Sequence, residues 1–114
     1  MSECLFCRIV RKEIPASVIY EDDDLIVFND INAQAPLHAL VVPRRHIPTL
    51  NDLSSQDDGL IGQMIRRAAA IAGEKGYADR GFRTVFNTNG EAGQTVFHIH
   101  LHLLAGRGLA WPPG

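Results

Sequence analysis

The segment 94–104 contains a regular alternation of polar and apolar residues, and it constrains the fold more than any other part of the chain. Because successive side chains of a β-strand point to opposite faces, this alternation predicts a strand over 96–104. One face of the strand would carry Phe97, Ile99, Leu101 and Leu103, and we expect this face to lie under the long helix predicted below. The other face would carry His98, His100 and His102, which are three of the five histidines in the chain.

A single half-buried histidine is usually structural, but three on one strand face are difficult to explain by packing. Metal binding is one alternative. In a straight strand the outer two histidines lie about 13 Å apart at Cα, whereas zinc needs nitrogen ligands at about 2.0–2.1 Å, so a three-histidine metal centre is disfavoured. The other alternative is nucleophilic and acid–base catalysis, in which one neutral imidazole attacks an electrophile while a neighbour about 6.6 Å away holds a proton.

The remaining hydrophobic patterns predict four more strands and two helices. Runs rich in β-branched and aromatic residues, separated by turn residues, predict strands over 17–20, 25–28, 39–42 and 82–86. Apolar residues at helical spacing predict a short helix within 4–12 and a long helix over about 55–75. Ser54 or Ser55 would cap the long helix in a capping box with Asp57 or Asp58, three residues on. Because strands outnumber helices and several are joined by short turns, the expected class is α+β with a mainly antiparallel sheet.

Composition limits the possible functions. The chain has 114 residues, enough for one core under one sheet, so we expect residues 1–114 to form one domain. A net charge of −2 gives no basic stripe for nucleic acid. The sequence has neither an apolar run long enough for a membrane helix nor a signal peptide, so the expected compartment is the cytoplasm. In that reducing compartment Cys4 and Cys7 are free thiols or metal ligands.

The residues before the histidine strand suggest what the histidines act on. The loop 87–95 carries glycines, amide side chains and hydroxyls, so its backbone N–H groups can turn toward an anion such as a phosphate. A loop of this composition is more often only a turn, and it gains significance from the histidines that follow. Neither a Walker-type motif nor a Rossmann glycine fingerprint is present, so kinase, NTPase and dinucleotide-binding functions lose their main support.

The motif His98-Ile99-His100-Leu101-His102-Leu103-Leu104 closely resembles the signature of the histidine triad (HIT) family, in which His-x-His-x-His is followed by two apolar residues. Further blocks resemble the Hint branch of purine nucleoside phosphoramidases, in the order 11–16, 21–23, 30–31, 34–36, 43–47, 93–94 and 111–114. The resemblance covers nearly the whole chain. It implies the HIT-like fold, a mainly antiparallel five-stranded sheet with one long and one short helix, in a dimer that joins two sheets.

The resemblance also implies an activity. His100 would be the nucleophile that attacks the α-phosphorus of an AMP-amine or acyl-AMP, giving a nucleotidyl-histidine that water then cleaves. His102 would contact the phosphate and assist proton transfer, with His98 and His38 as the supporting pair. Asp30 would bind the ribose hydroxyls. Besides His100 and His102, the implied nucleotide-binding residues are Phe28, Asn29, Asp30, Ile31, Asn87, Gly93, Gln94 and Thr95.

Some alternatives remain open. Without the resemblance, Asp30 would be interpreted as a turn cap and His38 as a satisfied buried histidine. Animal members of the branch usually carry Ser at the position of Thr95 and His at that of Asn29, which bears on turnover and base preference. Two other functions are a dinucleoside polyphosphate hydrolase or nucleotidyl transferase of the same family, and a non-catalytic nucleotide-binding adaptor. The motifs do not specify the physiological substrate or its leaving group.

Cys4 and Cys7 have the C-x₂-C spacing that is typical of zinc ligands, although no second such pair exists. His46 and His98 would complete the set, and the resemblance to some bacterial relatives implies zinc at these places. Animal members of the branch lack the cysteines, so the chemistry would require no cofactor. We therefore expect a reduced, metal-free pair, with a structural zinc as the alternative.

Two expectations concern a second copy of the chain. The long helix would turn Leu60, Met64, Ala68 and Ile71 toward the sheet, which leaves Ala69 and Ala72 for the homodimer that the resemblance also implies. The C-terminal segment 111–114 would be ordered, and Trp111 would contribute to the substrate pocket of the partner subunit. Two prolines after Trp111 lower the entropy lost when this large aromatic residue docks.

Overall fold

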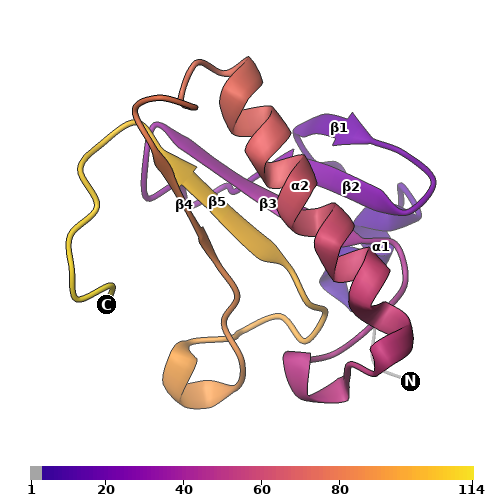
Figure 1. The fold of residues 1–114 in the computed structure, drawn as a ribbon. Coiled ribbons are helices and arrows are strands. Elements are labelled where there is room, and N and C mark those ends of the chain that lie inside the picture. The colour runs from indigo at the N-terminus through magenta and orange to yellow at the C-terminus, as the bar shows by residue number, and fades with distance from the viewer. Residues whose placement is uncertain (1–3) are drawn as a thin grey trace.

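The computed structural model describes residues 4–114, so residues 1–3 of the expected domain lie outside the described part of the chain. Five strands form one sheet in the order β1-β2-β3-β5-β4, and every neighbouring pair is antiparallel. The long helix α2 (Asp58–Glu74) crosses one face of the sheet, and the short helix α1 (Leu5–Val10) packs on the other (Figure 1). The expected α+β class and antiparallel five-stranded sheet are confirmed.

The sheet is buried on both faces because its side chains alternate. The central strand β3 is buried along its whole length: Ala39 and Val41 contact the core beneath α2, whereas Leu40 and Val42 contact the core beneath α1. The near-continuous apolar run of 39–42 is what a strand covered on both faces requires. The strands are β1 (Val18–Glu21), β2 (Leu25–Asn29), β3 (Leu37–Pro43), β4 (Phe82–Val85) and β5 (Leu101–Ala105).

The last strand is shorter than its alternation predicts, because β5 begins at Leu101 rather than at residue 96. Its ladder with β3 ends at the pair Val41–Leu101. Farther along β3, the carbonyl of Pro43 accepts a hydrogen bond from the ring of His98 at 2.7 Å. The segment 96–98 bends away, and the prediction that Phe97 lies beneath α2 is wrong, since its side chain is 47% exposed. Ile99, Leu101 and Leu103 do lie in that core.

A 3₁₀ turn, Ser55–Asp57, directly precedes helix α2, which explains why the predicted helix start at residue 55 is early. Ser54 and Asp57 form the predicted capping box: the Ser54 hydroxyl accepts from the backbone N–H of Gln56, and the Asp57 carboxylate accepts from that of Ser54. The α-helical part then begins at Asp58. At the other end Gly76 adopts a φ of +89°, a conformation that glycine tolerates and that ends the helix.

The buried face of α2 consists of Met64, Ala68, Ile71 and Ala72. The expectation that Ala72 is available to a partner subunit is wrong, because it is fully buried in the core of its own chain. Ala69, the other small residue of that expectation, is exposed. None of the helices in the described residues is long and apolar enough to cross a membrane.

The core beneath α2 predicts a contrast between two neighbouring positions. Met64 is fully buried, so Met64→Ala should lower the free energy of unfolding by about 2–5 kcal/mol, through lost burial and the cavity left behind. Ile65 is 50% exposed on the same helix, so Ile65→Ala should change stability by about 0.5 kcal/mol or less. Urea unfolding of both variants measures the difference, and equal losses would contradict this account of the core.

Candidate active site

A cavity of about 530 Å³ lies on the face of the sheet that carries α1. Its walls come from α1, the connection 14–17, the end of β2 and the loop before β5. The expected nucleotide-binding residues that line it are Phe28, Asn29, Asp30, Ile31, Asn87, Gly93, Thr95, His100 and His102. The structure therefore gathers residues from three separate stretches of the chain around one cavity. His38, Gln94 and His98 do not line it.

Sequence reasoning missed the contribution of α1 and of the connection that follows it. Phe6, Ile9 and Ile14 line the cavity, together with Ala16 and Ser17. The spacing of Phe6 and Ile9 is compatible with one buried helix face, but it cannot show which distant segment that face contacts. Both residues pack in the core that includes Phe28, and the rings of Phe6 and Phe28 meet edge to face at a centroid distance of 5.5 Å.

The proton of His102 is placed by a chain of hydrogen bonds that starts at a backbone amide. The N–H of Gln34 donates to Nδ1 of His38 at 3.0 Å, so in the neutral ring the proton of His38 is on Nε2. Nε2 of His38 then donates to Nδ1 of His102 at 2.9 Å. His102 consequently carries its own proton on Nε2, the nitrogen that remains for a ligand in the cavity.

Asp30 supports this chain from the cavity wall. One of its carboxylate oxygens lies 3.3 Å from Nε2 of His38, and the other accepts from the backbone N–H of Asn32 at 2.8 Å. The carboxylate thus caps a turn, as the sequence alone suggests, and also lies beside a buried histidine. Burial lowers the pKa of His38, and the charge of Asp30 opposes this shift.

His100 is oriented by a neighbour in its own segment. Its Nδ1–H donates to the backbone carbonyl of His98 at 2.8 Å, which leaves Nε2 with the lone pair. The ring of Phe6 packs edge-on against the His100 ring, with a centroid distance of 4.9 Å and an interplanar angle of 87°. The tautomer of His100 is therefore opposite to that of His102: one ring offers a lone pair at Nε2, and the other offers a proton.

Burial disfavours the charged form of all three histidines of the motif. Burial lowers the pKa of His98 and of His102 to about 4 each, and repulsion from neighbouring histidines contributes to both shifts. Burial also lowers the pKa of His100. A neutral imidazole retains the lone pair that a nucleophile needs, so the surroundings of His100 favour its reactive form.

Gln94 shapes the loop before β5. Its buried amide accepts from the backbone N–H of Asn89 at 2.8 Å and donates to the carbonyls of Pro48 at 2.8 Å and Val96 at 3.1 Å. The side chain of Gln94, expected to contact the nucleotide, is thus committed to hydrogen bonds within the protein. Gly93 beside it has a φ of +85°, which glycine adopts without strain.

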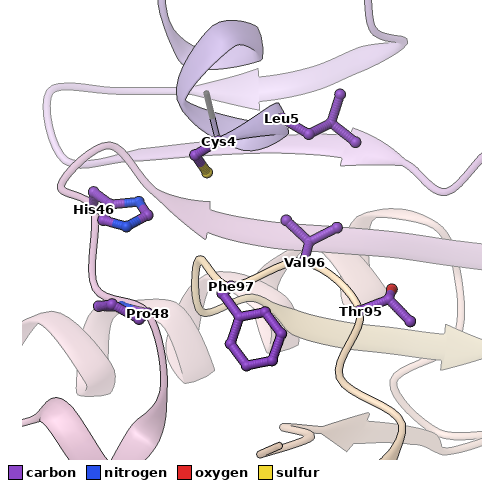
Figure 2. A pocket seen from close by; sticks show the side chains of 7 residues that line it. All are labelled: Cys4, Leu5, His46, Pro48, Thr95, Val96 and Phe97. Carbon is purple, nitrogen blue, oxygen red and sulfur yellow. The ribbon is translucent and has the colours of Figure 1, made fainter. Parts of the chain in front are cut away.

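A second hollow of about 530 Å³ adjoins the first (Figure 2). The two share Leu5, Thr95 and Val96, so these residues form the wall between them. Figure 2 shows Cys4 and His46 at one end of this hollow and Thr95 at the other. The exposed hydroxyl-bearing residue Thr95 therefore lies at the boundary between the two hollows.

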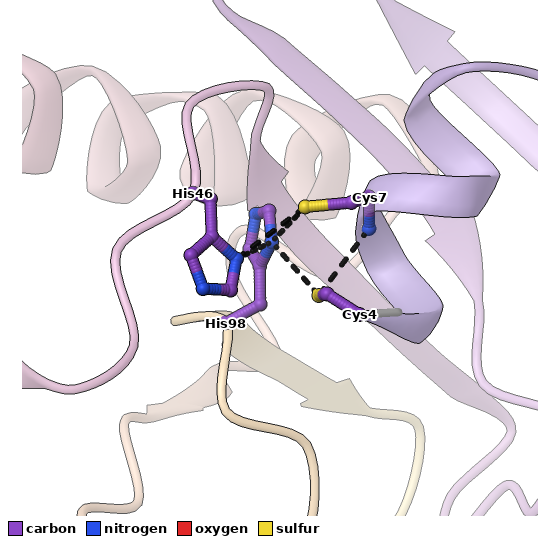
Figure 3. A group of neighbouring side chains, drawn as sticks. All are labelled: Cys4, Cys7, His46 and His98. Atoms are coloured by element: carbon purple, nitrogen blue, oxygen red, sulfur yellow. Dashed lines mark hydrogen bonds between the residues drawn. The ribbon is translucent and has the colours of Figure 1, made fainter. Parts of the chain in front are cut away.

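Behind this hollow, two cysteines and two histidines from distant segments converge (Figure 3). Nδ1 of His98 lies 3.3 Å from Sγ of Cys4, 3.5 Å from Sγ of Cys7 and 3.2 Å from Nδ1 of His46. Sγ of Cys7 lies 3.3 Å from the same nitrogen of His46. Neither cysteine forms a disulfide within the described residues. The four side chains expected as alternative zinc ligands thus form one cluster.

The geometry and chemistry of this cluster fit zinc. Ligands at the zinc–nitrogen and zinc–sulfur distances of about 2.0–2.3 Å lie about 3.3–3.8 Å from one another in a tetrahedron. The four donor atoms lie within 4.8 Å of one another, and the separations of 3.2–3.5 Å given above are close to the tetrahedral range. His98 donates from Nε2 to the carbonyl of Pro43, which leaves its Nδ1 unprotonated toward the cysteines, as a metal ligand must be.

The C-terminal tail is held near its start. The guanidinium of Arg83 in β4 donates to the backbone carbonyls of Leu109 at 3.3 Å and Ala110 at 3.0 Å. Trp111, which follows, is 82% exposed and does not line the cavity of its own chain. The exposed side chain of Trp111 therefore directly follows a backbone segment that Arg83 holds in place.

Comparisons with known proteins find chains of similar sequence and similar fold. Residues 3–108 match the family model described as scavenger mRNA decapping enzyme C-term binding. The purine nucleoside phosphoramidase of Escherichia coli is 48% identical over 107 residues, which cover 94% of this chain and 90% of that protein. A crystal structure of a HIT family hydrolase from Legionella pneumophila has a TM-score of 0.97 and 48% identity, covering 98% of this chain and 100% of that one. The chain belongs to the histidine triad family.

Membership confirms the resemblance that the motif predicts, and the HIT-like fold with it. A histidine triad protein from Clostridium difficile has a TM-score of 0.91 at 40% identity, covering 96% of this chain and 97% of that one. Within this histidine triad protein the three histidines are not equivalent. His98 faces the cysteines, whereas His100 and His102 reach the cavity with opposite protonation at Nε2.

Proposed function

We propose that this histidine triad protein is a hydrolase that cleaves AMP-amines or acyl-AMP through a covalent nucleotidyl-histidine at His100. The observation that carries the proposal is the orientation of His100: Nδ1 donates to the carbonyl of His98 at 2.8 Å, and Nε2 keeps its lone pair in a residue that lines the cavity. The relatives named as a purine nucleoside phosphoramidase and as a HIT family hydrolase support the same activity.

The nucleotide would lie along the cavity with its base beside β2. Phe28 and Ile31 would enclose the base, with Asn29 next to them, and the carboxylate of Asp30 would accept hydrogen bonds from the ribose hydroxyls. The phosphate would then lie between the loop 87–95 and the two cavity histidines. Asn87, Gly93 and Thr95 of that loop line the cavity and offer amide, backbone and hydroxyl groups to it.

In the first step the Nε2 lone pair of His100 attacks the α-phosphorus and the phosphorus–nitrogen bond breaks. The departing nitrogen takes a proton from water and leaves as the amine, while the nucleotidyl group stays on Nε2 of His100. His102 donates from Nε2 to the phosphoryl oxygens, and this donor is oriented before the substrate arrives because His38 holds Nδ1 of His102.

In the second step a water molecule attacks the same phosphorus. The bond between phosphorus and Nε2 of His100 breaks, AMP leaves, and the proton lost by water returns to solvent. The sum of both steps consumes one water and releases one amine and one AMP. With an acyl-AMP the phosphorus–oxygen bond breaks instead, and a carboxylate leaves.

Replacing the nucleophile tests the proposal. His100→Ala should retain the fold and AMP binding but lose AMP-amine hydrolysis by several orders of magnitude, because no other group in the cavity replaces the Nε2 lone pair. Product release and the mass of the protein are both measured during turnover of an AMP-amine. Wild-type protein should show the added nucleotidyl mass, and His100→Ala should not. Unchanged hydrolysis by the variant would sink the assignment, and a wild type that binds AMP without turnover would indicate an adaptor.

We also propose that the protein is a homodimer in which two sheets join. Strand β4 is at one edge of the sheet, and its outer side pairs with no strand of the described chain. Phe82 of β4 and Ile65 of α2 expose apolar side chains, 38% and 50% respectively. Pairing of β4 with its copy would satisfy the unpaired N–H and C=O groups of that edge, which can otherwise pair with other chains and cause aggregation. Light scattering at micromolar concentration should give twice the chain mass of 12.6 kDa, and a value near 12.6 kDa would contradict the dimer.

In that dimer Trp111 would complete the substrate pocket of the partner subunit. Two observations support this role: Arg83 holds the backbone just before Trp111, and the indole of Trp111 is highly exposed. Deleting residues 110–114 should change the relative hydrolysis rates among AMP-amines with different leaving groups, while AMP affinity and the fold stay intact. A truncated protein with the parent's leaving-group preference would show that the tail has no such role.

We further propose a structural zinc held by Cys4, Cys7, His46 and His98, in a protein that acts in the reducing cytoplasm. The convergence of four donors supports the alternative over the expected metal-free pair. The ion would cross-link α1 to the segments that carry His46 and His98, and neither His100 nor His102 would be one of its ligands.

Zinc content tests the site. Protein purified with zinc should retain one ion per chain by elemental mass spectrometry, and Cys4→Ser should lower this content sharply. A serine hydroxyl can still accept the helix-capping hydrogen bond that Sγ of Cys4 accepts from the N–H of Cys7, but it is a poor zinc ligand. Arg8→Gln is the control, since Arg8 lies on the same helix and pairs with Glu13. Zinc-free wild-type protein under these conditions would contradict the site.

A further inference from the structure

His98 belongs to two groups of residues at once. Its ring faces Cys4, Cys7 and His46, and its backbone carbonyl accepts the hydrogen bond that orients His100. We infer that the cysteine–histidine cluster positions the nucleophile: with zinc bound, the ring of His98 is fixed, and with it the carbonyl that holds Nδ1 of His100. The inference rests on the proposed reaction at His100 and on the proposed zinc site. Cys4, Cys7 and His46 become positioning residues, none of which lines the nucleotide cavity.

The segment that carries His98 and His100 has little support from the sheet. The ladder between β3 and β5 ends at Leu101, so both histidines lie outside it. Just before the strand, the N–H of Ile99 donates a main-chain hydrogen bond to the carbonyl of Ile47 at 2.8 Å. Because a peptide unit is planar, this bond holds one side of the unit that also carries the His98 carbonyl, and the side-chain contacts of His98 hold the other side.

The ring of His98 is where those contacts concentrate. It is fully buried, and Nε2 donates to the carbonyl of Pro43 at 2.7 Å. Its other nitrogen points at the three remaining members of the cluster, at 3.2–3.5 Å. A ring held at one nitrogen by the end of β3 can still pivot about that bond. A ligand bond at Nδ1 removes the pivot, and the backbone atoms of the same residue are then confined with it.

Helix α1 provides a second link between the cluster and His100. Phe6 lies between Cys4 and Cys7 in sequence. Its ring packs edge-on against the rings of His98 and His100, with centroid distances of 6.0 and 4.9 Å respectively. The helix has only six residues, too few to be stable by itself, so its position depends on tertiary contacts. Two thiolate ligands on α1 would fix that position, and Phe6 would then confine the His100 ring from a second side.

By positioning the His98 carbonyl, the cysteine–histidine cluster would stabilise the Nδ1–H tautomer of His100. If the His98 carbonyl moves away, the proton of His100 can occupy either nitrogen, and the fraction with a lone pair on Nε2 falls. Nucleophilic attack also requires near-ideal alignment, since a displacement of about 1 Å can cost about a hundredfold in rate. Nucleotide binding depends on other residues, notably Phe28 and Asp30, so the expected loss is in the rate of attack rather than in affinity.

The test compares zinc-loaded wild-type protein with the same protein after chelation, and with His46→Gln and Arg8→Gln. His46 is exposed, and removing its ring takes one ligand away from the cluster without touching the cavity. Four quantities are measured: zinc content, the ¹⁵N chemical shifts of the His100 ring, the single-turnover rate of nucleotidyl transfer to the protein from an AMP-amine, and the KM for that AMP-amine. Circular dichroism verifies that every sample is folded.

Chelated wild type and His46→Gln should show His100 shifts that move from the Nδ1–H form toward the tautomer average. Their transfer rates should fall about tenfold to a hundredfold, the range found when groups that orient a ligand are removed, with KM unchanged. Arg8→Gln should match the loaded wild type. Unchanged ring shifts after zinc removal would overturn the inference, as would a rise in KM that accounts for the whole effect, or a protein that takes up no zinc. If the wild type transfers no nucleotidyl group, the proposed function fails, and the ring shifts still decide the positioning role.

Discussion

The structure depends on the two-residue period of a sheet that is covered on both faces. Side chains of one parity in β2, β3 and β5 enter the core beneath α2, and those of the other parity meet α1 and the cavity. His38 and His102 fall in the second set and His100, one residue before β5, shares their parity, so the three rings gather on one side although His38 lies more than 60 residues from the other two. A shift of register by one residue would exchange the two sets and send the rings into the apolar core.

Backbone groups then determine what each ring can do. An N–H group can only donate and a carbonyl can only accept, so a histidine beside one of them has its proton placed without ambiguity. Gln34 sets His38 and through it His102, the carbonyl of His98 sets His100, and the carbonyl of Pro43 sets His98. The polar groups of the cavity are thereby oriented in the free protein, which is how a site avoids the cost of reorganising during reaction.

The sequence predicts this fold well where a pattern is local. The alternation in β5, the helical spacing in α2 and the Ser54–Asp57 capping box each depend on neighbours within a few residues. The same alternation misleads at Phe97, because a hydrogen bond between His98 and Pro43, 55 positions apart, replaces the ladder there. Contacts of that kind leave no periodic trace in a single sequence.

The candidate site shows the same division. The motif itself identifies His98, His100 and His102, but their different partners become visible only in three dimensions. The side-chain amide of Gln94 could bind a phosphate, yet it already forms three hydrogen bonds with backbone groups of the protein. The spacing of Cys4 and Cys7 leaves zinc undecided, and the convergence of His46 and His98 on them depends on separations of more than 30 residues. Only the resemblance to a family anticipates Asp30 and His38 as site residues.

The double use of His98 has a consequence for how such a chain can diverge. If zinc is bound as proposed, Cys4, Cys7 and His46 share the task of holding it, so a lineage could lose all three together once other contacts cap α1 and immobilise the ring of His98. His98 cannot be discarded with them, because the carbonyl of Pro43 would lose its donor and the turn before β5 its anchor. Three of the four proposed ligands could therefore be lost as a unit, while the fourth would be retained by a constraint that does not come from the metal.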